Sequence, residues 1–149
     1  MENITFSAAQ FTATTENLLQ SGGTIPLTVT GNSMNPFLID KKDTVWLKAH
    51  SEADIKTGKI LLFKKTDGSI VLHRVRHILP DGYILMNGDA QLQCEKIKPE
   101  QVIAVATHLQ RNSKKRLLKK RPFWHILYPL RPLILKFWRK LRVIYGKNK

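Results

Sequence analysis

The sequence predicts a mostly β body built from hairpins, with a short helix before it and a basic, amphipathic helical tail after it. Short runs rich in Val, Ile and Leu predict the strands, and Asp67-Gly68 and Pro80-Asp81-Gly82 lie between them. Asp-Gly supplies the positive φ angles that tight hairpins need. Charge separates the tail from the body: residues 1–110 hold 11 basic and 11 acidic residues, whereas residues 111–149 hold 14 basic residues and no acid.

The elements are expected in a simple order along the chain. Residues 4–20 favour a short amphipathic helix that ends at Gly22-Gly23. Strands are expected at residues 25–30, 44–48, 59–63, 69–78, 82–86 and 102–108. We therefore divide the chain into an N-terminal helix over 1–23, a β domain over 24–110 and a basic tail over 111–149.

The tail contains a second predicted helix. Pro129 and Pro132 would break a helix that began at Phe123, so we expect an amphipathic helix from Leu133 onward. Its apolar face is predicted to hold Ile134, Phe137, Trp138, Leu141 and Tyr145, and its cations Lys136, Arg139, Lys140 and Arg142 lie largely elsewhere.

The composition of the tail indicates a polyanionic partner. Basic residues mixed with Trp and Tyr are typical of segments that lie at a membrane surface. The predicted contacts with a membrane or another polyanion are Trp124, Phe137, Trp138, Arg139 and Lys140. Nucleic acid is the alternative, since aromatic side chains can stack on bases. A helix that docks on a partner protein is the third alternative.

Other features of the sequence predict the compartment. The first 20 residues lack the pattern of a secretory signal peptide, and no stretch reaches the ~20 apolar residues that span a bilayer. Cys94 is the single cysteine, so neither an internal disulfide nor a cysteine-based zinc site is expected. We expect a cytoplasmic protein that is peripherally associated with the inner face of the membrane.

Three short strings within 60 residues carry candidate chemistry. They are Gly31-Asn32-Ser33-Met34-Asn35-Pro36, then Leu72-His73-Arg74-Val75, then Asn87-Gly88-Asp89. Taken singly, Ser33 is more typical of a polar loop and His73 of a packed histidine, and Asp89 is typical of an aspartate in a turn. Together they supply a hydroxyl nucleophile, an imidazole base and a carboxylate that could orient the base.

These strings resemble the signal peptidase I superfamily, which includes self-cleaving phage-type repressors. The resemblance covers Thr24 to Leu109 and is to the Ser-His branch, because His73 stands where other relatives have Lys. It implies a coiled β-sheet with Ser33 as nucleophile, His73 as base and Asp89 as the orienting carboxylate. It also implies an extended substrate strand with small side chains before the cut. The Ser33 N–H would be an oxyanion donor. Gly31 stands where some relatives add a hydroxyl, so a second donor would be a backbone N–H or would come from elsewhere.

The resemblance implies no cofactor. A metal at His73 and His77 is not expected either, because four residues of strand separate their positions by roughly 13 Å. Relatives have Gly-Asp where this chain has Lys42-Asp43, and Gly-Asp again where it has Gly58-Lys59. Both positions are interpreted as structural.

The sequence therefore predicts a serine endopeptidase of signal-peptidase type, which removes a leader or signal from a precursor peptide or protein at or near the membrane. Two alternatives come from other functional classes. One is a self-cleaving or partner-binding regulatory module. The other is a non-catalytic protein that binds nucleic acid through its basic tail.

Overall fold

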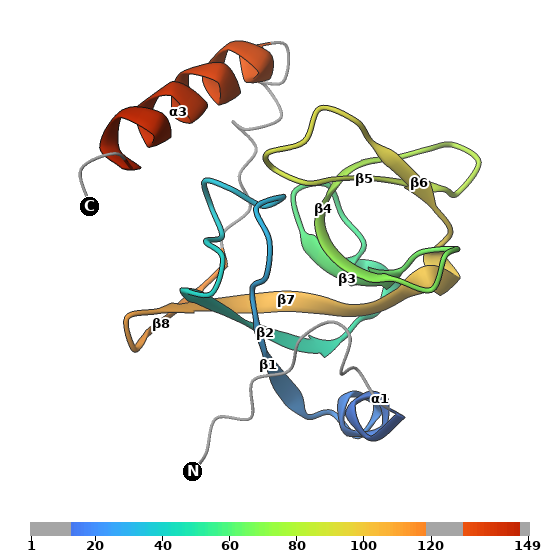
Figure 1. The fold of residues 1–149 in the computed structure, drawn as a ribbon. Helices are drawn as coiled ribbons and strands as arrows, with labels where there is room; N and C mark the ends of the chain where they lie inside the picture. Colours follow the sequence, from blue (N-terminus) through green and yellow to red (C-terminus); the bar gives the residue numbers. More distant parts are fainter. Residues whose placement is uncertain (1–12, 119–129, 147–149) are drawn as a thin grey trace.

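A computed structural model describes residues 13–118 and 130–146 (Figure 1). An eight-stranded antiparallel sheet dominates it, with helix α1 (Ala13–Gln20) before the sheet and helix α3 (Arg131–Gly146) after it. The strands are β1 (Thr24–Thr28), β2 (Asp43–Ala49), β3 (Ile60–Lys64), β4 (Ile70–Ile78), β5 (Ile84–Asn87), β6 (Glu95–Ile97), β7 (Val102–Arg111) and β8 (Lys114–Leu117). The predicted mostly β fold is confirmed.

The strands run in the order β1-β2-β7-β3-β4-β5-β6, and β8 pairs with β7. Sequence neighbours therefore form hairpins from β3 to β6, whereas β7 returns from the end of the body to lie between β2 and β3. This long-range pairing joins the hairpins to the β1–β2 pair. As a result, the loops that follow β1 and β5 can meet although 50 residues separate them.

The sheet is buried on both sides at its centre. Every residue from Ile60 to Phe63 is buried, which suits a continuous apolar run without alternation. One core cluster includes Leu27, Leu62 and Ala104, and a second on the other face includes Phe63, Val75 and Met86. Because β3 lies between the two cores, its pairing with β4 determines which β4 side chains face each core.

All six predicted strands are present within a few residues of their predicted bounds. Two further strands were not predicted. β6 has only three residues, Glu95-Lys96-Ile97, and β8 is Lys114-Lys115-Arg116-Leu117 with every residue exposed. Neither has the apolar alternation on which strand prediction depends: β6 buries only Ile97, and β8 buries no residue. β8 also continues the sheet past residue 110.

Both predicted helices are found in part. α1 covers the second half of the expected 4–20 helix, and residues 4–12 lie outside the described residues. α3 confirms the helix expected from Leu133, with Pro132 in its first turn, where a missing N–H costs nothing. Within 13–118 and 130–146, no helix is both long and apolar enough to cross a bilayer.

Candidate active site

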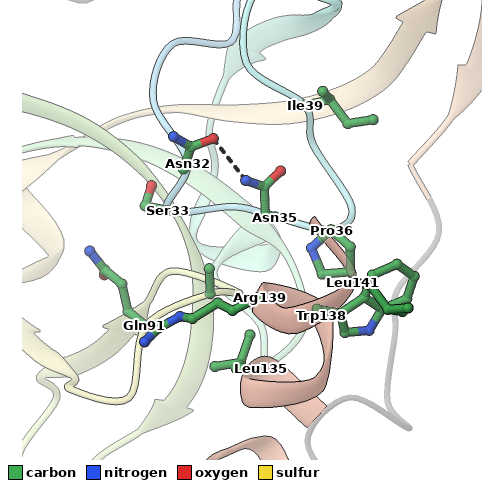
Figure 2. Close-up of a pocket in the computed structure, with 11 residues that line it drawn as sticks. Asn32, Ser33, Asn35, Pro36, Ile39, Gln91, Leu135, Trp138, Arg139 and Leu141 are labelled. Atoms are coloured by element: carbon green, nitrogen blue, oxygen red, sulfur yellow. Dashed lines mark hydrogen bonds between the residues drawn. The ribbon is translucent and has the colours of Figure 1, made fainter. Parts of the chain in front are cut away.

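Ser33 lies in the loop between β1 and β2. Gly31 has a φ of 80°, which favours glycine, and its N–H donates to Asp40 Oδ1 at 2.8 Å. Asn35 Nδ2 donates to Asn32 Oδ1 at 2.9 Å, so the two asparagines flanking Ser33 are tied together (Figure 2). The loop is therefore held by its own side chains around the serine.

A second loop, after β5, supports the serine from outside. The Ala90 N–H donates to the Ser33 carbonyl oxygen at 2.8 Å. A Cβ placed on Gly88 would lie only 2.7 Å from that same oxygen, so a larger residue there would push the loops apart. In the Gly88-Asp89 string, the missing side chain of the glycine is therefore as important for the position of Ser33 as the aspartate is.

His73 is a buried residue of β4. It is 3% exposed, and its ring lies 6.0 Å from the Phe63 ring, centroid to centroid. Its Nδ1 lies 3.5 Å from Glu95 Oε2. Both atoms are buried, and neither has a hydrogen-bond partner among the described residues. Glu95 of β6 thus places a carboxylate beside this nitrogen, and Lys65 pairs with the other oxygen of Glu95.

Burial is the main reason why the pKa of His73 is lowered from its usual 6.5. The negative charge of Glu95 opposes that shift, and a weaker contribution from Asp89 acts in the same direction. Lys65 lowers the pKa further. A histidine with a lowered pKa is neutral near pH 7, which is the form that can accept a proton.

Asp89, predicted to orient His73, has a different principal partner. Arg74 donates from Nε to Asp89 Oδ1 at 2.8 Å and from Nη2 to Oδ2 at 2.7 Å. Arg74 also donates from Nη1 to the Gly58 carbonyl at 2.8 Å. Both side chains are at least 95% buried. Asp89 therefore ties its loop to β4, and its carboxylate lies on the residue next to His73.

A second arginine–aspartate pair holds the far side of the Ser33 loop. Arg111 donates from Nε and Nη2 to the two oxygens of Asp43, both at 2.6 Å. Asp43 Oδ2 also accepts from the Ile39 N–H at 2.7 Å. Arg111 reaches the Phe37 carbonyl, and Arg74 lies 5.9 Å from the Phe37 ring. Phe37 thus contacts both arginines, and Asp43 has the structural role predicted for that position.

Ser33 and His73 are not joined by a hydrogen bond in the described residues. Hydrogen bonds between a catalytic nucleophile and its base commonly form or tighten only when substrate is bound. The Ser33 N–H has no partner among those residues, as an oxyanion donor requires, whereas the Gly31 N–H is engaged by Asp40.

A small groove lies beside Ser33, between two strands. A cavity of about 100 Å³ is lined by Thr28–Thr30 at the end of β1 and by Ile70–Leu72 at the start of β4, with Ser33 among its walls. Among the described residues, β1 pairs only with β2, and β4 meets β5 only from Arg74 onward. The backbones on the two sides of the groove therefore have unpaired edges, and one of them leads directly to His73.

The predicted tail contacts fall in different places. Trp124 lies outside the described residues. Phe137 is 61% exposed, and Lys140 is also exposed. Trp138 and Arg139 line a larger cavity that reaches Ser33. No group of three or more His, Cys, Asp or Glu side chains suited to a metal occurs in the described part of the chain.

Glu95 was not singled out from the sequence. It follows Gln93-Cys94 in a short polar segment that carries no motif. The only available signal was its place six residues after Asp89, within reach of the hairpin that contains His73. Its position beside the imidazole depends on β6 pairing with β5, which the sequence did not predict.

The chain belongs to the Peptidase S24-like family, whose model matches residues 2–109. This match covers Ser33, His73, Asp89 and Glu95 and ends before the basic tail. Membership of this family supports a serine peptidase or a self-cleaving regulatory module. It does not single out a signal peptidase. A search of curated proteins found no match.

Proposed function

We propose that this chain is a serine endopeptidase that cuts an extended peptide, with Ser33 as the nucleophile and His73 as the general base. The groove between the unpaired edges of β1 and β4 carries the proposal, because Ser33 is among its walls and the start of the strand of His73 lines it. A peptide can bind in such a groove by adding a strand between two edges. Membership of the Peptidase S24-like family supports the same chemistry.

The reaction follows from these parts. Ser33 Oγ attacks the peptide carbonyl, and His73 accepts its proton on the ring nitrogen that faces away from Glu95. The Ser33 N–H donates to the oxyanion. The C–N bond then breaks, and the imidazolium gives its proton to the leaving amine. Water, activated by neutral His73, hydrolyses the serine ester and regenerates Ser33.

In this mechanism Glu95 orients the imidazole and stabilises its protonated form. Its Oε2 is 3.5 Å from His73 Nδ1 and has no hydrogen-bond partner among the described residues. We assign Asp89 to the support of the nucleophile loop, since Arg74 engages both of its carboxylate oxygens. The electrostatic effect of Asp89 on His73 is secondary to that of Glu95.

The substrate that we propose is a precursor peptide with a leader. The groove beside Ser33 is small and is lined by aliphatic side chains such as Leu27, Leu62 and Leu72. A volume of about 100 Å³ favours small side chains just before the cut. Precursors matured before or during export, rather than ordinary secretory preproteins, suit a peptidase that works at the inner face of the membrane.

The tail supports the proposed membrane association. Leu133, Phe137 and Val143 are all more than 60% exposed on α3. Lys136 and Lys140 are exposed on the same helix. Each cation near an anionic surface contributes about 1 kcal/mol, so a few are enough for reversible attachment. We expect the full chain to bind phosphatidylserine-containing vesicles, and stronger binding to oligonucleotides than to these vesicles would contradict membrane association.

The test of the enzymatic proposal is cleavage of a defined peptide mixture by the full chain, followed by mass spectrometry. Ser33→Ala should abolish cleavage, and Ser113→Ala, in the exposed turn between β7 and β8, is the matched control. Small leader-bearing precursors should be cut more efficiently than secretory preproteins. Cleavage that persists in Ser33→Ala would refute the proposal.

The family also favours a second candidate, a self-cleaving regulatory module. The two are separated by how the rate depends on concentration. Cleavage within one chain is independent of protein concentration and produces fragments of this chain. Cleavage of a separate peptide increases with enzyme concentration and leaves the chain intact.

A further inference from the structure

A second, larger cavity lies on the other side of Ser33, between its loop and α3. Its volume is about 680 Å³, within the range of about 300–1,000 Å³ that is typical of ligand sites. Pro36, Ile39 and Ala90 contribute from the body, and Leu135, Trp138 and Leu141 contribute from α3. Figure 2 shows the helix side chains facing the loop that carries Ser33.

Ser33 is the one residue of the described chain that lines both this cavity and the groove between β1 and β4. A peptide bond held over the nucleophile has an acyl side and a leaving side, which extend away from it in opposite directions. If the groove takes the acyl side, the cavity under α3 is the space next to the nucleophile that remains for the leaving side.

The chemistry of the cavity limits what it can hold. Its walls are mostly apolar, and Leu135 of α3, which is one of them, is only 7% exposed. Arg139 supplies a positive charge and makes no ion pair with any described residue. In Figure 2 its side chain extends from α3 toward Gln91, below Ser33 in this view.

We propose that this cavity is the leaving-side subsite of the peptidase and takes large apolar residues after the cut, followed by an acidic residue that pairs with Arg139. This inference rests on the proposed function and adds to it a preference for the second product. Trp138 and Arg139 of α3, which were predicted to contact a membrane, then also determine which residues are accepted after the cut.

The test measures binding without turnover, by NMR titration of the full chain carrying Ser33→Ala. The probe is the tripeptide amide Phe-Leu-Glu-NH₂, whose free amine matches a leaving product; Gly-Ser-Glu-NH₂ and Phe-Leu-Gln-NH₂ are the comparison peptides. Phe-Leu-Glu-NH₂ should shift the signals of Leu135, Leu141 and Ala90 and should bind most tightly of the three.

Matched variants on α3 locate the contact. Leu141→Ala removes a wall of the cavity and should weaken binding about tenfold, the effect of losing a buried leucine contact. Val143→Ala, on a residue that is 62% exposed and outside the cavity, should leave affinity unchanged. Arg139→Gln should abolish the preference for Glu over Gln, whereas Lys140→Gln should retain it.

The inference is overturned if Phe-Leu-Glu-NH₂ does not bind, if Leu141→Ala and Val143→Ala weaken it equally, or if dodecanoate shifts the cavity signals while the tripeptide does not. The last result would indicate an acyl chain as the occupant. The proposed function is tested separately, because a chain with intact Ser33 that cleaves no peptide, or cleavage that persists in Ser33→Ala, would refute it whatever the tripeptide does. Cleavage with no tripeptide binding would refute the subsite alone.

Discussion

Two carboxylates lie near His73, and their surroundings differ. Asp89 is almost completely buried, and Arg74 binds both of its oxygens. Glu95 is 29% exposed at its side chain, and one of its oxygens faces His73 Nδ1 without a hydrogen bond. A fully satisfied buried carboxylate stabilises structure, whereas one with an unused oxygen beside an imidazole can respond when that imidazole becomes charged.

The largest effect that we predict is structural. Asp89→Asn removes the charge that compensates buried Arg74 and should lower the free energy of unfolding by about 3–5 kcal/mol. Urea unfolding measures it. Asp81→Asn, which breaks an exposed pair with Lys96, is the control and should change stability little. A folded, equally stable Asp89→Asn that has lost only activity would restore the catalytic role expected from the sequence.

The opposite result is predicted for Glu95. Glu95→Gln keeps the shape of the side chain but loses the charge that stabilises protonated His73, so Ser33-dependent cleavage should slow by about 100-fold. Stability should change far less than in Asp89→Asn, because the side chain is partly exposed. Steady-state rates with one cleaved peptide measure the effect, and Glu100→Gln, on an exposed residue, is the control. An unchanged rate would remove Glu95 from the mechanism.

The smallest predicted effect is a shift of the pH profile. Activity should fall as pH drops through the lowered pKa of His73, below 6.5, because protonated His73 cannot act as a base. Glu95 raises this pKa and Lys65 lowers it, so Glu95→Gln should move the acid limb to lower pH and Lys65→Met should move it to higher pH. Rates measured between pH 4 and 8 test both signs. If the acid limb moved in the same direction in both variants, the opposite effects assigned to Glu95 and Lys65 would be contradicted.

The same pKa has a consequence for stability. The unfolded chain binds a proton at His73 more readily than the folded chain does, because burial lowers the folded pKa. Stability from this group is therefore present above about pH 6.5 and is lost as pH falls toward the folded pKa. His73→Gln should reduce the pH dependence of urea unfolding in that range, and an unchanged dependence would point to other titrating groups.

Local sequence was enough to predict most of the fold. The six apolar strands, the Asp-Gly turn between β3 and β4, and the helix expected from Leu133 all follow from patterns within ten or so residues. The short polar strands β6 and β8 could not be found in this way, because backbone pairing with neighbours rather than apolar burial defines them. The candidate nucleophile and base were found because they lie in short motifs, whereas Glu95 lies in none.

The sequence by itself determined a β body, a basic tail and a set of groups suited to serine chemistry, since composition, periodicity and motifs are local properties of the chain. Tertiary structure alone decided which carboxylate lies beside His73 and where the helix of the tail packs. Pairing of β5 with β6 brings Glu95 to the imidazole, Arg74 engages Asp89, and side chains of α3 line a cavity that Ser33 also lines. These outcomes depend on contacts between distant segments, which no local pattern records.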